Sequence, residues 1–392
     1  MRKFMLIFVA TCISVFGISC ANAKEKMTPK GRVNLRNANM YLQQMKLDKA
    51  MAFYEEVLKE NPNNLESIKK SGDIYFAWGE ERLSDPIDTT KSLDDQAKQR
   101  ILHDNQSVDS YINAFKKYEQ FQALIKDRSD LSPDEEDWQK ETTKKMIGCE
   151  ARIFRTGKDY VTMKDYETAI PIFVKLNQLD PAKPEPMKIL LFIYQDQQND
   201  AAEADKASYN SKIEDLLNKL LVINPKDPDT LSKLGAFYYT NKQIDKALPI
   251  FKQIEEMSPN DVDNLFTLVG IYYEKKMIQE AYDTDLKILA LEPNNLDAVD
   301  NAKNFAVELK KIPDANKYFG KLIELNNSTD NLSSYCYFLS QNNLYDDLLV
   351  VAKKWYEVDQ DSKLAVQFIV LAAGKLGKKD AVNYYNNILK KM

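Results

Sequence analysis

Acidic and tyrosine side chains recur in this chain at a fixed spacing of 34 residues. The three series are Asp229, Asp263 and Asp297; Glu274 and Glu308; and Tyr239 and Tyr273. A carboxylate pairs with lysine or arginine, and the face of a tyrosine ring attracts the same cations. Acids and tyrosines that share one repeat spacing therefore indicate a surface suited to a polypeptide with basic residues.

The sequence lacks the patterns that carry most enzymatic chemistry. It has no glycine-rich phosphate loop, no nucleophile elbow and no metal-ligand spacing. His103 is its one histidine, so neither a catalytic triad nor a zinc site can be assembled. We therefore expect no catalytic residue, no cofactor and no metal, and the protein is not expected to be an enzyme.

The composition also narrows the class of partner. The formal net charge is −5, which disfavours nucleic acid because its binding depends on clustered lysine and arginine. Carboxylates are plentiful, but at 29% charged residues this is the usual solvated surface of helices. Cys149 and Cys336 lie far apart along the chain, so no disulfide is expected between them.

A register of about 34 residues organises the chain. Its small, aromatic and proline positions are Gly235, Tyr238, Ala247, Phe251 and Pro259, and identical intervals separate Gly157, Tyr160, Ala169, Phe173 and Pro181. A fixed period of this length predicts stacked helical hairpins. Glycine or alanine at a helix crossing lets an aromatic neighbour pack closely, and proline cannot continue the second helix.

This pattern resembles the tetratricopeptide repeat family, and the resemblance covers nearly all of residues 31–392. It implies an all-α fold, a right-handed solenoid of about nine antiparallel helical hairpins spanning 24–392. The best-defined repeats are 31–64, 150–183, 228–261 and 262–295. The second repeat carries an insertion at 80–106 between its helices. After it, Ser132 and Glu135 predict a capping box at the start of a long helix.

One residue departs from the family pattern. Asp285 stands at the twenty-fourth place of its repeat, where Phe251 stands in the preceding repeat. A carboxylate buried there without a partner would be strongly destabilising. We therefore expect a slightly rotated helix in which Leu286 packs instead.

The resemblance also implies which side chains face a partner, because the first helix of each repeat lines the concave side in this family. Between 228 and 308 that face carries six carboxylates and no base. The expected partner-binding residues are Tyr239, Asp263, Tyr273, Glu274, Asp297, Asn304 and Glu308. For the aspartates in first helical turns, the helix dipole is a sufficient explanation without any ligand. The insertion at 80–106 and the lysine-rich segment 362–392 remain alternative docking surfaces.

Residues 1–23 have the three-part plan of a secretory signal. Two basic residues precede an apolar run to Ser19, and a small-residue site predicts cleavage after Ala23. Lipidation at Cys20 is the alternative, although the residues before it lack the usual leucine. No later segment is apolar enough to span a membrane. Export to the periplasm or cell envelope is the expected location.

These patterns together predict a non-enzymatic scaffold or adaptor that holds a polypeptide on its concave face. A lipid-anchored structural component of an envelope assembly complex is the alternative, which a mature N-terminus at Lys24 would exclude. An enzyme subunit that only presents substrate would share the same fold.

Overall fold

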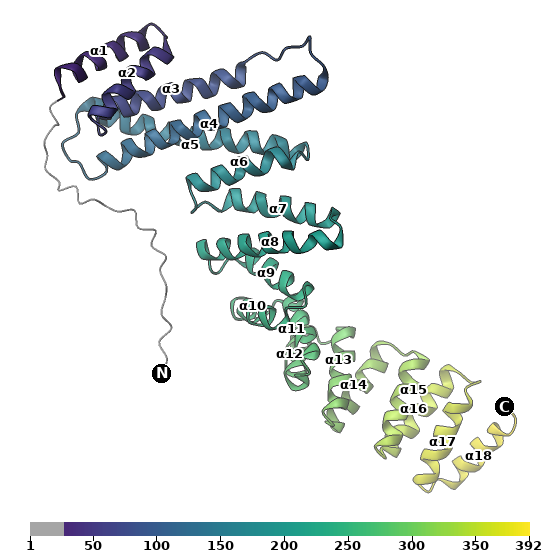
Figure 1. Ribbon diagram of the computed structural model, residues 1–392. Coiled ribbons are helices and arrows are strands. Elements are labelled where there is room, and N and C mark those ends of the chain that lie inside the picture. Colours follow the sequence, from purple (N-terminus) through teal and green to yellow (C-terminus); the bar gives the residue numbers. More distant parts are fainter. Residues whose placement is uncertain (1–26) are drawn as a thin grey trace. The chain divides into compact units, whose positions relative to one another are not determined.

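The computed structural model describes residues 27–392, and helices account for most of them (Figure 1). Within this part of the chain there are eighteen helices, which pack in sequential pairs. The prediction of an all-α array of helical hairpins is confirmed. The predicted signal segment 1–23, with Cys20, lies outside the described residues.

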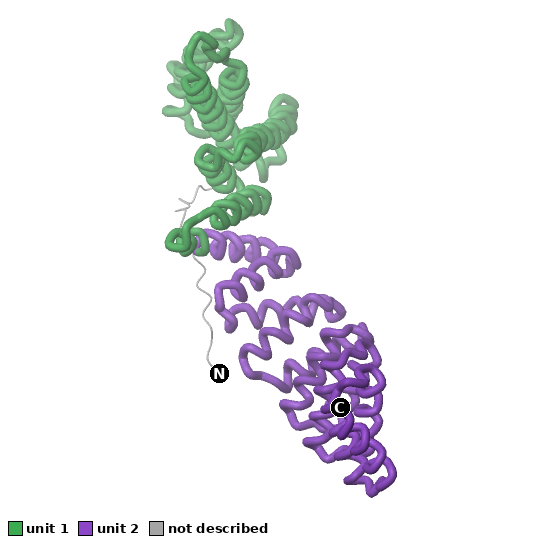
Figure 2. The backbone as a smooth tube through the Cα atoms, turned by 90° about the vertical axis from the view of Figure 1, so that its right-hand side faces the viewer, with its two compact units in different colours: residues 1–210 green, residues 211–392 purple. Residues whose placement is uncertain are grey.

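The chain forms two compact units, which meet between Asn210 and Ser211 inside one helix, α8 (Figure 2). The helices that begin in the first unit are α1 (Pro29–Gln43), α2 (Leu47–Glu60), α3 (Leu65–Ser84), α4 (Leu93–Ile125), α5 (Pro133–Thr162), α6 (Tyr166–Leu179), α7 (Pro184–Asp200) and α8 (Glu203–Ile223). Those of the second unit are α9 (Pro228–Thr240), α10 (Ile244–Met257), α11 (Val262–Glu274), α12 (Ile278–Leu291), α13 (Leu296–Glu308), α14 (Ile312–Leu325), α15 (Thr329–Gln341), α16 (Tyr345–Val358), α17 (Lys363–Lys375) and α18 (Lys379–Leu389).

The segment predicted as an insertion, 80–106, is largely helical. It lengthens α3 to 20 residues and α4 to 33 residues and leaves a short connection between them. The helix that follows, α5, runs unbroken for 30 residues. Its capping box is confirmed: Ser132 Oγ accepts from the Glu135 backbone N–H at 3.3 Å, and the Glu135 carboxylate accepts from the Ser132 N–H at 2.7 Å.

Four charged side chains join α3 to α5 in a closed ring of ion pairs. Lys69 Nζ lies 2.7 Å from Asp73 and 2.6 Å from Glu141, and Lys145 Nζ lies 2.8 Å from each of the same two carboxylates. The Lys69 side chain is only 4% exposed. Tyr118 on α4 donates to Asp73 at 3.0 Å. The buried ammonium thus has two carboxylate partners, as a buried charge requires.

The turn inside most hairpins contains a residue with positive φ. These residues are Met45, Lys164, Lys242, Lys276, Lys310, Asn343 and Gly377. Within the described chain, the α3–α4 and α7–α8 connections lack such a residue. Lys242, Lys276 and Lys310 are 34 apart, whereas Asn343 follows after 33, so the register slips by one residue before α15.

The packing of the hairpins follows the predicted register. A Cβ built on Gly235 would lie 3.0 Å from the ring of Phe251, and one on Gly157 would lie 2.9 Å from the ring of Phe173. Phe251 and Phe173 are both buried. At each position only glycine leaves room for the aromatic ring of the second helix in the same hairpin.

Replacing Gly235 with valine should lower the free energy of unfolding by about 1–3 kcal/mol, because the new side chain must displace the Phe251 ring. Gly270→Ala is the matched control. Its Cβ would meet only Tyr239 Oη, at an ordinary contact distance of 3.5 Å, and alanine favours the helix. Urea unfolding followed by circular dichroism measures both. Equal stability of Gly235→Val and the parent would contradict the assigned packing.

The expectation for Asp285 is wrong. Its side chain is fully buried, while Leu286 is only partly buried. Asp285 follows the buried Tyr282 and Thr284 and precedes Ile288 on the packed side of α12, so the helix keeps the family register. Within the described chain neither carboxylate oxygen has a hydrogen-bond partner of good geometry. Burial raises the pKa of Asp285 to about 7, an effect that the side-chain amide of Asn301 partly offsets.

Candidate functional site

The seven predicted partner-binding residues lie on the first helices of three successive hairpins. Tyr239 is on α9; Asp263, Tyr273 and Glu274 are on α11; and Asp297, Asn304 and Glu308 are on α13. We call this surface the first-helix face. All are exposed except Tyr239, which is half-buried. Residues far apart in sequence are thereby placed on adjacent helices of one unit.

Two of these residues touch across adjacent hairpins. Tyr239 Oη donates to Glu274 Oε1 at 3.1 Å. Burial, and then the contact with Glu274, raise the pKa of Tyr239. The hydroxyl also lies over Gly270, where an added Cβ would meet nothing else within 4 Å. The backbone of α11 is therefore open beside this tyrosine, which would let an extended chain approach closely.

Tyr273 is the most exposed aromatic residue of the set, at 56%. Its ring centroid lies 5.9 Å from that of Phe305 on α13, at an interplanar angle of 47°. Asn304 on the same helix donates to Asp300 at 2.9 Å. Phe305 was not predicted as part of the site; it holds the Tyr273 ring from the neighbouring hairpin.

The first-helix face is less acidic than the sequence suggests. Lys233 pairs with Asp229 at 2.5 Å, and Lys303 pairs with Asp300 at 2.5 Å. Lys303 is mostly buried, with its ammonium 5.3 Å from the centroid of the Phe319 ring. These lysines lie three or four residues from their acids on one helix, a spacing at which side chains meet. Within residues 27–392 no salt bridge is formed by the remaining four carboxylates, those of Asp263, Glu274, Asp297 and Glu308.

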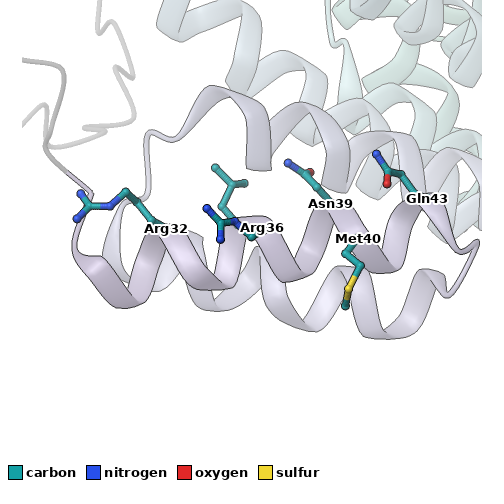
Figure 3. Close-up of a pocket in the computed structure, with 6 residues that line it drawn as sticks. Arg32, Arg36, Asn39, Met40 and Gln43 are labelled. Carbon is teal, nitrogen blue, oxygen red and sulfur yellow. The ribbon is translucent and has the colours of Figure 1, made fainter.

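A second, basic surface lies in the other unit, on α1. A cavity of about 440 Å³ is lined by Arg32, Leu35, Arg36, Asn39, Met40 and Gln43, which follow one another along this helix (Figure 3). Arg32 donates to the Met27 carbonyl at 2.8 Å. Asn39 is fixed between Tyr54, which donates to it at 2.5 Å, and Glu66, to which it donates at 2.8 Å.

The α1 surface was not predicted, because all the expected partner-binding residues lie between 228 and 308. The signal was available in the sequence. Arg32 and Arg36 are four residues apart, so they share one side of a helix. The two surfaces belong to different units and have opposite charge.

The hairpin formed by α1 and α2 also has a recognisable sequence. Residues 32–64 match the model of the tetratricopeptide repeat family. The chain contains a tetratricopeptide repeat. The matched residues include Asn39 of the α1 surface, and they end just before α3.

Solved structures of tetratricopeptide type also resemble part of the chain. YrrB, described as a TPR protein with an unusual peptide-binding site, is 18% identical; the match covers 45% of this chain and 86% of YrrB, with a TM-score of 0.35. A MamA structure is 20% identical, with 42% and 91% covered and a TM-score of 0.33. MamA from Desulfovibrio magneticus RS-1 is 16% identical, with 45% and 95% covered and a TM-score of 0.34. None of the curated proteins matches the chain in sequence.

The described residues meet the requirements neither of a metal site nor of a reactive cysteine. No cluster of histidine, cysteine, aspartate and glutamate among them could hold a metal ion. Burial raises the pKa of the Cys149 and Cys336 thiols to about 12, so neither is a reactive thiolate at neutral pH. In the same part of the chain, no helix is long and apolar enough to cross a membrane.

Proposed function

We propose that this tetratricopeptide-repeat protein is a non-enzymatic scaffold of the cell envelope, and that its first-helix face binds a polypeptide segment carrying lysine or arginine. Proteins of this repeat type bind other proteins and peptides. The observation that carries the proposal is the set of four exposed carboxylates without salt bridges on α11 and α13, together with the hydrogen bond from Tyr239 to one of them, Glu274. An incoming cation would meet a carboxylate and an aromatic ring together.

The location in the envelope is supported by the signal-like residues 1–23 alone. A lipid-anchored structural component of an envelope assembly complex remains the alternative, with Cys20 as the acylated residue. Sequencing the mature N-terminus separates the two. A chain that starts at Lys24 supports soluble export, whereas one that starts at a modified Cys20 supports the anchored form.

Reversing two charges on the first-helix face should weaken binding of basic peptides by at least about tenfold, because two attractive contacts become repulsive. The variant is Glu274→Lys/Glu308→Lys. The measurement is fluorescence polarisation with labelled peptides in which tyrosine or serine alternates with lysine, followed by cross-linked affinity capture from native envelope. Raised salt should weaken the same binding, since the carboxylates are exposed.

Glu256→Lys/Glu280→Lys provides the matched control. Both acids are exposed, and they lie on the second helices α10 and α12 rather than on the first-helix face. The control should bind like the parent. If both double variants lose affinity equally, net charge alone governs binding and the first-helix face is not the site. If neither loses affinity, the proposed function of this face is wrong.

A further inference from the structure

A cavity on the second-helix side of the second unit belongs to none of the surfaces above. It measures about 500 Å³, within the range of ligand sites in proteins. Its apolar walls are Leu289 of α12, Pro293 in the turn after α12, Val299 of α13 and Tyr318 of α14. Val299 and Tyr318 are buried and belong to the packed core, whereas Leu289 is partly buried and Pro293 is exposed.

Gly320 keeps this cavity open. It lies in the middle of α14, where glycine costs about 1 kcal/mol relative to alanine. Gly235 and Gly157 are required by rings that leave no room for a Cβ. At Gly320, by contrast, an added Cβ would meet only Tyr335 Oη, at 3.8 Å. Packing of the hairpin does not require this glycine, whereas a larger side chain at the position would reduce the cavity.

The charged residues that line the cavity are two lysines and one glutamate, Glu324, so its rim has a net positive charge in a chain with an excess of acid. Lys317 and Lys321 are four residues apart on α14 and both line it. Lys317 forms no salt bridge within the described residues; its ammonium lies 5.0 Å from the centroid of the Tyr318 ring. Lys321 is 4.0 Å from Glu324, whose side chain is 70% exposed. Such a surface pair contributes little, so both ammonium groups are available to an anion.

The polar wall of the cavity is the side chain of Asn316, which is held by two hydrogen bonds. Asn316 accepts from Tyr335 Oη at 2.8 Å and donates to Asp347 at 2.9 Å. Both partners belong to the next hairpin, formed by α15 and α16. The wall is therefore fixed before any ligand arrives, which reduces the entropy lost on binding.

We propose that this cavity is a second polypeptide-binding site, which takes a bulky apolar side chain flanked by carboxylates. The apolar side chain would contact Leu289, Pro293 and Val299, and the flanking carboxylates would pair with Lys317 and Lys321. The first-helix face has the opposite charge preference. One chain would thus hold two different polypeptide segments, a basic one on its first helices and an acidic one in the cavity beside the second helices α12 and α14.

The test uses an array of capped hexapeptides in which a single leucine, isoleucine, phenylalanine or tryptophan is flanked by glutamates, serines or lysines. Five forms of the full chain are compared by fluorescence polarisation: the parent, Gly320→Leu, Lys317→Glu/Lys321→Glu, Glu274→Lys/Glu308→Lys, and the control Lys252→Glu/Lys353→Glu. The control changes two exposed lysines on α10 and α16, outside the cavity, so the change in net charge is the same.

The parent should bind glutamate-flanked peptides at least about tenfold more tightly than lysine-flanked ones. Gly320→Leu should lose at least tenfold of that affinity while its melting temperature stays equal or rises, since leucine favours the helix. The lysine double variant should reverse the preference, and the control should keep it. Glu274→Lys/Glu308→Lys should also keep it, so a failure here is distinct from a failure of the first-helix face.

The proposal is overturned if the parent shows no preference for acidic flanks, or if Gly320→Leu binds the selected peptides like the parent. Dodecanoate, added as a competitor and as a direct ligand, supplies a further contrary outcome. Binding of dodecanoate that Gly320→Leu abolishes, with no binding of any peptide, would make the cavity a lipid site and the proposal wrong.

Discussion

Lys69→Met should lower the free energy of unfolding of the first unit by about 3 kcal/mol. The substitution keeps the length of the side chain but removes the buried ammonium that lies between Asp73 and Glu141. Breaking a buried pair by removing one partner costs about 3–5 kcal/mol, because a charge is left without compensation. Lys145 still pairs with both carboxylates, so we expect a value at the low end.

Lys98→Met is the matched control for this prediction. Lys98 also pairs with an acid four residues away, Asp94, but the two side chains are 69% and 76% exposed. An exposed pair of this kind is worth about 0.5 kcal/mol or less. Urea unfolding and amide hydrogen exchange in α3 and α5 measure both variants. If the two lysines cost the same, the ring of ion pairs is as well solvated as the surface pair, contrary to the structure.

The ring should also fail in acid. Burial raises the pKa of Glu141, but hydrogen bonds from Lys145 and Lys69 lower it by a larger amount. The resulting pKa is about 2. The folded-state value thus lies below the usual 4.5. The contribution of Glu141 to stability is therefore complete above about pH 4.5 and is lost as the pH falls toward 2.

Contacts inside one hairpin were the easiest to predict. Gly235 and Phe251 are 16 residues apart, and the register that relates them repeats along the chain. The ion-pair ring could not be predicted in the same way. Lys145 and Asp73 are 72 residues apart, a separation set by the extended α3, α4 and α5. A 34-residue register does not indicate which residues face each other across such elongated helices.

The charge of the first-helix face was predicted only in part, for a different reason. The family rule selects particular places on the first helix and ignores the places between them. Lys233 and Lys303 stand at those intermediate places, and they neutralise Asp229 and Asp300. Their spacing from the acids was visible in the sequence. Whether an exposed acid has a partner therefore depends on the whole helix and not on the selected places alone.

Asp285 shows that the repeat register outweighs the chemistry of one side chain. The neighbours of Asp285 on α12, Ala281, Tyr282 and Ile288, are all buried. Rotating the helix to expose one carboxylate would also expose them, and burial of such side chains is worth about 1.5–3 kcal/mol each for the larger ones. The carboxyl group of Asp285 therefore stays in the core, where burial raises its pKa.

Asp285→Asn should remove a pH dependence that the parent shows between about pH 4 and pH 7. The pKa of Asp285 is raised by burial from 3.8 to about 7. Between these values the folded state holds a proton that the unfolded state has released. The contribution of Asp285 is therefore complete below about pH 4, falls by about 1.4 kcal/mol per pH unit, and is constant above pH 7. The whole change is about 4 kcal/mol.

The measurement is urea unfolding of the full chain at several values between pH 4.5 and pH 8.5, expressed as the difference between parent and variant. Asp283→Asn, an exposed aspartate on the same helix, should leave the pH dependence unchanged. Asp285→Leu should be more stable than the parent at pH 8, since it replaces a buried unpaired carboxylate with an apolar side chain. A parent curve that parallels Asp285→Asn would mean that this carboxylate reaches water. In that case α12 would be rotated as the sequence first suggested, with Leu286 in the core.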